Sequence, residues 1–284
     1  MKAEQPSATA LRVAIRRAAH QILDHPKVFD DPLAEQIIGT EAADLLKAEV
    51  QEGQTRVARS LRAFIAARSR FAEDALAQGV ERGVCQYVIL GAGLDTLAYR
   101  NPYADREGQV FEVDHPVTQA WKQRMLAAAG ISIPPTLTFA PVNFEKQNLS
   151  EGLTQAGFDP RRAAFFSWLG VTPYLTEEAF EATARFIASM PLGSGVAFDY
   201  AVPRSSLSLP EKMAFDTISA RVAAAGEPFR LFFDPGALLE KLKGLGFVAV
   251  TDLDSEKINS RYFTARTDGL RIAGGPAHLL SAWI

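Results

Sequence analysis

Short apolar runs alternate with segments of helical periodicity from residue 84 to the end of the chain. An apolar run between turn residues is typical of a buried strand, and apolar positions three and four apart are typical of a helix packed against it. We expect strands near 84–90, 109–113, 136–142, 162–168, 194–200, 246–253 and 277–283. We expect helices near 116–129, 146–156, 176–190 and 235–244, with Gly130, Gly157 and Gly244 at three of their carboxyl ends. This order predicts an α/β fold with a doubly wound, mostly parallel, seven-stranded sheet.

Two other parts of the chain have helical patterns without strands. Residues 1–82 contain the clearest helix, expected at 54–78, and its apolar stripe consists of Val57, Leu61, Phe64, Phe71 and Ala75. Residues 201–234 form an insertion after the fifth strand, with a helix expected at 211–225. We expect both parts to form an α-helical cap over domain 83–284, the whole chain being one structural unit. For the insertion, the alternative is a surface excursion unconnected with any ligand.

A glycine turn follows the first strand. The apolar run ends at Gly91, Ala92 and Gly93, and glycines at such a turn let a ligand contact the backbone directly. The carboxyl end of a central strand is where open α/β sheets bind nucleotides. Roughly 20 residues later the second strand ends at Asp114, and a carboxylate at that spacing can hold both hydroxyls of a ribose.

The residues after the turn favour one class of nucleotide. A dinucleotide-binding turn needs a small residue three positions after its second glycine, where this chain has Thr96. Asp95, at the start of the expected following helix, would repel a pyrophosphate. A cofactor with a ribose and a cationic centre but no phosphate, such as S-adenosylmethionine, suits the turn better, and no P-loop sequence occurs. The alternative is a purely structural turn in which Asp95 caps the helix.

Five segments resemble the leucine carboxyl methyltransferase-like family of class I S-adenosylmethionine-dependent methyltransferases. They are GAGLDTLAYR at 91–100, FEVDHP at 111–116, FDDP at 29–32, ARSRFAED at 67–74 and FFSWLGVTPYL at 165–175. They occur in the family's order and span most of the chain. The resemblance implies a Rossmann-like methyltransferase fold and S-adenosyl-L-methionine as cofactor, and it points to the bacterial branch, whose substrates are mostly uncharacterised.

Arg68 lies on the apolar stripe of the helix expected at 54–78, four positions after Phe64. A guanidinium on a buried face needs an anionic partner, because an unpaired buried charge is very costly. The family resemblance implies that this partner is the methionyl carboxylate of the cofactor. The alternatives are an internal ion pair with Asp74 or Asp95, or a side chain that extends to solvent. Arg70 falls off the stripe and is expected to be exposed.

The ends of the second and third strands supply further candidates. The resemblance implies that Asp114 binds the ribose, with His115 beside it, although His115 and the following proline also suit the start of a helix. Asn143 stands where relatives often have an aspartate that contacts the adenine amino group, and an amide oxygen can accept the same hydrogen bond. Phe144 is expected to contact the adenine ring or to pack in the core.

The methyl-transfer centre is expected just beyond the fourth strand. Trp168 is a candidate for cofactor contact, and Tyr174 and Tyr200 are candidates for the acceptor pocket, with core packing as the alternative for each. In the eukaryotic branch of the family a glutamate holds this region, whereas Leu169 stands here, which weakens any transfer of the protein-carboxyl substrate. No catalytic cluster is recognisable, and the four histidines are too scattered for a metal motif.

Composition excludes several other classes of protein. The net charge of −3 over 284 residues gives no polyanion-binding surface, and no apolar run is long enough for a membrane span. Cys85 is the single cysteine, so it forms no intrachain disulfide and is expected to be a buried thiol. Arginines near the N-terminus faintly resemble a transit peptide, but an ordinary surface helix explains them better, so we expect a cytoplasmic protein.

Together these features predict an S-adenosylmethionine-dependent methyltransferase that acts on an oxygen, a carboxylate or hydroxyl, of a small molecule. No nucleic acid or membrane partner is expected. A Rossmann-type NAD(P)-dependent oxidoreductase is the alternative enzyme, disfavoured by Thr96 and Asp95. A protein that binds S-adenosylmethionine without catalysis is the alternative from another class.

Overall fold

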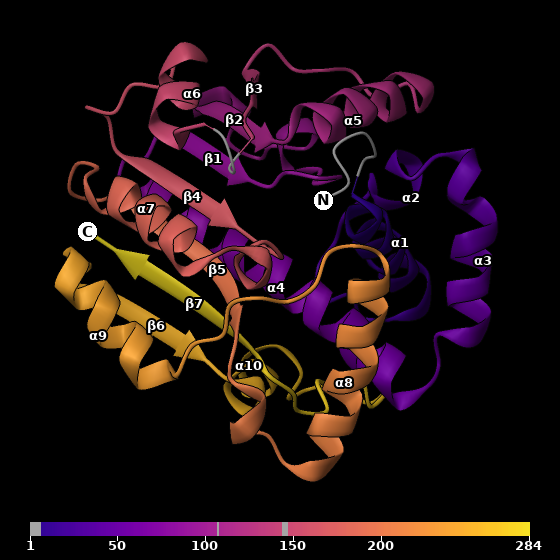
Figure 1. Cartoon of the computed structure of the whole chain (residues 1–284). Coiled ribbons are helices and arrows are strands. Elements are labelled where there is room, and N and C mark those ends of the chain that lie inside the picture. The colour runs from indigo at the N-terminus through magenta and orange to yellow at the C-terminus, as the bar shows by residue number, and fades with distance from the viewer. Residues whose placement is uncertain (1–6, 107, 144–146) are drawn as a thin grey trace.

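The computed structural model describes residues 7–106, 108–143 and 147–284, and its centre is a seven-stranded sheet (Figure 1). The strands are β1 (Gln86–Leu90), β2 (Gln109–Asp114), β3 (Leu137–Pro141), β4 (Ala164–Trp168), β5 (Gly195–Ala201), β6 (Ala249–Leu253) and β7 (Ala277–Trp283). Their order across the sheet is β3-β2-β1-β4-β5-β7-β6, and only β7 runs antiparallel to its neighbours. The predicted fold class and all seven predicted strands are confirmed.

Helices pack on both faces of the sheet. They are α1 (Ala8–Leu23), α2 (Ala34–Ile37), α3 (Ala43–Glu52), α4 (Arg56–Glu81), α5 (Pro116–Ala128), α6 (Leu149–Gln155), α7 (Glu177–Ala188), α8 (Leu209–Ala224), α9 (Pro235–Leu245) and α10 (Ser255–Tyr262). One core lies between the sheet and helices α6, α7 and α9, and a second lies between the sheet and helices α4 and α10. A third, smaller core joins α1 and α2 to α5.

Helix α4 begins after Thr55, whose side chain accepts a hydrogen bond from the Ala58 N–H and so caps the helix. The expected stripe is buried from Phe64 onward, whereas Val57 is exposed. Burial in the middle of α4 extends beyond one stripe, because the sheet covers one side of this helix and α1 packs on another. Arg70 is exposed, as predicted, and its Nε lies 2.7 Å from Asp74 Oδ1.

The structure differs from the sequence prediction in three connections. The chain after β1 forms only a short 3-10 turn, η2 (Leu97–Tyr99), in place of the expected helix. Gly244 lies inside α9, which ends instead at Gly246 with a φ of 109°. Helix α10 was not predicted, because only Ile258 among its eight residues is buried and its sequence has no apolar stripe.

The N-terminal helices α1, α2 and α3 gather beside one end of the sheet (Figure 1). The 201–234 insertion contains α8, which has a capping box between Ser208 and Glu211. The segment from α8 to α9 returns to the sheet: the Arg230 N–H donates to the Pro173 carbonyl, and the Phe233 N–H donates to the Ala201 carbonyl. These bonds attach the insertion to the carboxyl ends of β4 and β5.

Candidate functional site

A cavity of about 370 Å³ lies at the carboxyl ends of β1 and β4, where the strand order of the sheet reverses. Open α/β sheets bind ligands at this position, and this volume is ordinary for a small-molecule site. Its lining comes from the ends of β1, β2 and β4, from α1, and from residues 226–228 and 230 of the insertion. Both parts of the expected cap therefore contribute residues to the cavity.

The glycine turn forms one wall of the cavity. Gly91 has a φ of 68° and Gly93 a φ of 45°, a region that side chains disfavour. A Cβ at Gly91 would lie 2.3 Å from Val171 Cγ2, and one at Gly93 would lie 3.2 Å from Ala10 Cβ. The space that these glycines leave is thus occupied by the protein itself, while their backbone still lines the cavity.

Asp114 lies at the end of β2 and holds the turn in place. Its Oδ2 accepts a hydrogen bond of 2.6 Å from the Gly93 N–H, and its Oδ1 accepts one of 2.6 Å from the His115 N–H. Burial raises the pKa of this carboxyl group above its ordinary value, although the two backbone hydrogen bonds lower it. His115 caps α5, because its Nδ1 accepts from the Val117 N–H at 3.3 Å. Both side chains also line the cavity.

Arg68 is buried and lines the cavity, as its position on α4 predicts. Its Nη1 lies 3.3 Å from Asp199 Oδ2, so its internal partner is Asp199 and not Asp74 or Asp95. The other oxygen of Asp199 accepts a 2.5 Å hydrogen bond from the Gly170 N–H. Because a guanidinium carries five N–H donors, this single long contact leaves Arg68 able to bind an anionic ligand group.

The structure separates the remaining candidates. Asn143 and Tyr174 line the cavity, whereas Phe144 lies outside the described residues. The predictions for Trp168 and Tyr200 do not agree with their placement, because neither side chain lines the cavity. Trp168 is 1% exposed and stacks on Phe180 in the core under α7. The Tyr200 hydroxyl donates to Asp252 Oδ1 at 2.9 Å, on the opposite face of the sheet from Asp199.

A buried ionic network beneath the turn explains two of the sequence motifs. Asp31, from the FDDP segment, is 1% exposed and forms an ion pair of 2.7 Å with Arg17 of α1. It also accepts a 2.7 Å hydrogen bond from the Thr96 hydroxyl and lies 3.4 Å from Arg100 Nε. Arg100 in turn pairs with Glu73 of the ARSRFAED segment. Thr96 therefore has a structural role through this hydrogen bond, and the network joins α1, the glycine turn and α4.

Three charged cavity residues, Arg17, Glu227 and Arg230, were not predicted from the sequence. Arg17 lies on α1 and donates to the Leu94 carbonyl at 2.5 Å, next to the turn. Glu227 and Arg230 come from the insertion, where no spacing rule connects them to the glycine turn. Leu169, at the position of the family's glutamate, also lines the cavity, so its apolar side chain faces the ligand space.

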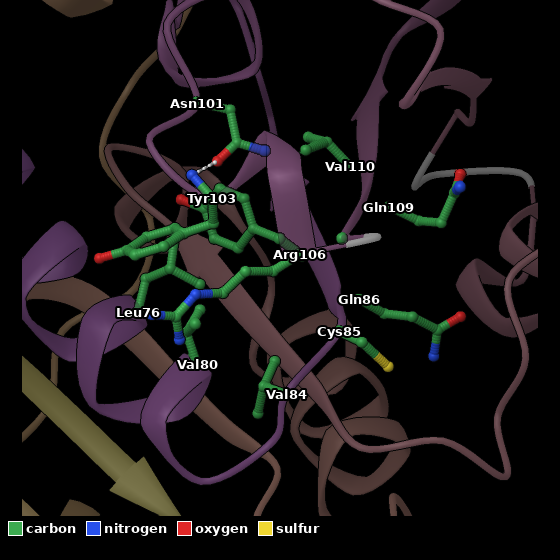
Figure 2. A pocket seen from close by; sticks show the side chains of 12 residues that line it. Leu76, Val80, Val84, Cys85, Gln86, Asn101, Tyr103, Arg106, Gln109 and Val110 are labelled. Carbon is green, nitrogen blue, oxygen red and sulfur yellow. Dashed lines mark hydrogen bonds between the residues drawn. The ribbon is translucent and has the colours of Figure 1, made fainter.

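A second, much smaller cavity lies at the amino ends of β1 and β2, near Tyr103 and Arg106 (Figure 2). Its volume of about 30 Å³ holds roughly one water molecule, so it is too small for a cofactor. Cys85 lines this space and is only partly buried, in contrast to the expected buried thiol. We therefore assign no ligand to it.

Metal binding and membrane spanning both lack support in the described part of the chain. Among these residues, no cluster of histidine, cysteine, aspartate and glutamate is arranged to hold a metal ion. In the same residues, no helix combines the length and apolar character that crossing a membrane requires.

Comparison with known proteins identifies the family. The model of the leucine carboxyl methyltransferase family matches residues 10–188, more than half of the chain. A Bacillus subtilis (strain 168) protein named "Putative S-adenosyl-L-methionine-dependent methyltransferase YktD" is 33% identical in an alignment that covers 95% of each chain. A similarly named protein of Mycolicibacterium smegmatis is 34% identical, covering 69% of this chain and 67% of that protein.

A solved structure shows the same architecture. A DUF574 family protein from Streptomyces avermitilis superposes with a TM-score of 0.60 at 16% identity, covering 96% of both chains. At this identity the superposition supports the fold, and the family model supports the assignment. The chain therefore belongs to the leucine carboxyl methyltransferase family.

Proposed function

We propose that this methyltransferase transfers the methyl group of S-adenosylmethionine to an oxygen, a carboxylate or hydroxyl, of a small molecule bound in the 370 Å³ cavity. The observation that carries the proposal is the meeting of the glycine turn, Asp114 and Arg68 in that one cavity at the switch point of the sheet. Family membership and the names of the relatives support the reaction class and the cofactor.

The lining residues have the chemistry that this cofactor requires. The carboxylate of Asp114 would accept hydrogen bonds from the ribose hydroxyls, and the free donors of Arg68 would bind the methionyl carboxylate. The amide of Asn143 would face the adenine, at the end of β3. Positively and negatively charged side chains thus line one cavity. The charged methionyl part of the cofactor and its adenosine part can therefore each bind to groups of suitable chemistry there.

The bound cofactor supplies a methyl group on a sulfonium, which is already an activated leaving group. The protein's part is to align the acceptor and to exclude water from the cavity. Both are served by α1 and the insertion, which contribute Ala10, Val13 and Pro228 to the lining. A cavity of this size and the net charge of −3 support a small-molecule acceptor over a nucleic acid or a membrane surface.

Isothermal titration calorimetry tests the cofactor assignment directly. The proposal expects S-adenosylhomocysteine to bind and NADH to give no heat, and the reverse result would contradict it. Incubation with a metabolite library and S-adenosylmethionine labelled in its methyl group then tests the reaction. Label in an ester or ether product supports O-methylation, and binding without any labelled product would favour a non-catalytic role.

A further inference from the structure

Glu227 is a cavity residue that the cofactor assignment does not use. It follows α8 directly, after Gly226 with a φ of 84°, and its N–H donates to the Val222 carbonyl at 3.0 Å. Two residues later Phe229 packs against Tyr174 with a ring distance of 5.3 Å, and the Arg230 N–H donates to the Pro173 carbonyl at 2.7 Å. These contacts attach the insertion to the turn after β4, so the backbone of Glu227 is held beside the cavity.

One oxygen of Glu227 has no hydrogen-bond partner. Within the described residues, Oε2 is inaccessible to solvent and accepts no hydrogen bond, although the residue lines the cavity. A buried acceptor without a donor lowers the stability of the folded protein, and more so when it is charged, so native proteins seldom contain one without a use. If the carboxylate turns so that this oxygen faces the cavity, an O–H or N–H group of a ligand can donate to it and remove that cost.

The position of Glu227 places it on the acceptor side of the cavity. The residues assigned to ribose and adenine lie at the ends of β1, β2 and β3, whereas Glu227 is fixed to the turn after β4. Tyr174 lines the same half of the cavity and packs against Phe229, two residues after Glu227. Burial and then the charge of Glu227 raise the pKa of this tyrosine to about 12. Leu169, Val171 and Leu175 provide apolar surface around them.

The negative charge of Glu227 discriminates between the two acceptor classes of the proposed function, a carboxylate and a hydroxyl group. A carboxylate in the cavity wall, such as the partly buried Glu227, repels a carboxylate acceptor and attracts a hydroxyl group. Arg230 also lines the cavity, but it is exposed, so solvent screens its attraction for anions. The buried oxygen of Glu227 therefore has the larger influence on which acceptor binds.

We infer that Glu227 binds the hydroxyl group of the methyl acceptor and takes its proton, so that the substrate is a hydroxyl compound with an apolar body and not a carboxylate. The inference rests on the proposed function. In the reaction the acceptor oxygen forms a bond to the methyl carbon, the bond from that carbon to sulfur breaks, and its electron pair stays on sulfur. The hydroxyl proton passes to the Glu227 carboxylate, which leaves a neutral carboxylic acid, a methyl ether and S-adenosylhomocysteine.

The test compares the wild-type protein with Glu227→Gln, which keeps the shape of the side chain and removes its charge. Glu256→Gln, an exposed position on α10 outside the cavity, is the matched control. Calorimetry first measures the affinity of each protein for S-adenosylhomocysteine. Saturation-transfer NMR on the saturated complexes then measures the binding of two matched pairs of probes, phenol with benzoate and cyclohexanol with cyclohexanecarboxylate.

We expect S-adenosylhomocysteine to bind all three proteins equally, which also shows that the variants fold. The wild-type and Glu256→Gln proteins should prefer the alcohol of each pair, and Glu227→Gln should lose that preference by about tenfold or more, the effect of one hydrogen bond to a charged group. A tenfold weaker binding of S-adenosylhomocysteine to Glu227→Gln would overturn the inference, because the carboxylate would then serve the cofactor.

An unchanged preference in Glu227→Gln, a preference of the wild-type protein for the acids, or no binding of either alcohol would also overturn it. If the wild-type protein does not bind S-adenosylhomocysteine at all, the proposed function fails instead. The two failures are therefore distinguishable in one series of measurements.

Discussion

Replacement of Gly91 by alanine tests the geometry of the glycine turn most sharply. The new Cβ would lie 2.3 Å from Val171 Cγ2, far inside van der Waals contact, on a backbone with a φ of 68°. A left-handed conformation costs a residue with a side chain about 1–2 kcal/mol. Overpacking at a site that cannot relax costs about 1–3 kcal/mol more. We therefore expect Gly91→Ala to lower the free energy of unfolding by about 2–5 kcal/mol.

The chain offers a matched control for the backbone contribution. Gly130 has a φ of 65°, and a Cβ built on it meets nothing within 4 Å. Gly130→Ala should therefore lose only the conformational cost of about 1–2 kcal/mol. The difference between the two variants isolates the collision with Val171. The double variant Gly91→Ala/Val171→Ala, compared with Val171→Ala alone, should recover most of that difference.

Urea denaturation of the four variants and the wild-type protein provides the measurement. Titration with S-adenosylhomocysteine adds a functional readout, since displacement of Val171 or of the turn should weaken binding. The reasoning is refuted if Gly91→Ala is no less stable than Gly130→Ala. Failure of Val171→Ala to rescue Gly91→Ala would show that the strain lies elsewhere.

Three further predictions concern the site and the buried charges. Asp114→Ala should raise the Kd of S-adenosylhomocysteine by about ten- to a hundredfold through lost charged hydrogen bonds, and an unchanged Kd by calorimetry in a folded variant would rule out ribose binding by this residue. Arg62→Met should lower the free energy of unfolding, measured by urea denaturation, by about 3–5 kcal/mol. Arg62 is 1% exposed, and its Nε and Nη2 donate to the two oxygens of Asp24 at 2.7 and 3.0 Å. A loss below about 1 kcal/mol would contradict this account. Burial alone would raise the pKa of Asp24, but hydrogen bonds from His20 and Arg62 outweigh it and lower the pKa from 3.8 to about 2. The folded state therefore holds this carboxyl ionised, so its contribution of about 2 kcal/mol is present above about pH 4 and is lost as the pH falls towards 2. Stability measured against pH should show this slope in the wild-type protein, and the same slope in Asp24→Asn would disprove its assignment.

The centre of the sheet could be predicted because β1, β4 and β5 are buried on both faces and therefore read as apolar runs. The order of elements then follows, and with it the meeting of Gly91, Asp114 and Arg68 at one edge. Helix α10 could not be recognised by the same means, since a helix with one buried residue leaves no periodic pattern. The missing helix after β1 has a different cause: Asp95 Oδ1 accepts from the Leu97 N–H and starts only a short 3-10 turn.

The errors at the site follow from the alternation of side chains along a strand. Ser167 faces the cavity and Trp168, the next residue, faces the opposite core. In the neighbouring strand Asp199 faces Arg68, whereas Tyr200 points away. The sequence prediction favoured the aromatic residues Trp168 and Tyr200. Asp199, an aspartate within an apolar strand, was the stronger indication of a functional position, because a buried carboxylate needs a partner. Glu227 gave no such signal, since the long insertion before it has no fixed spacing to the glycine turn.

The ionic network around Asp31 restricts how small molecules enter and leave the protein. Movement of α1 away from the turn would separate Arg17 from Asp31, and this buried carboxylate would lose its shorter ion pair and keep only the longer one with Arg100. We therefore expect α1 to remain seated throughout a turnover. Gly226, Pro228 and Arg230 of the insertion line the cavity and are exposed, so we expect exchange with solvent to take place past these residues and not past the N-terminal helix.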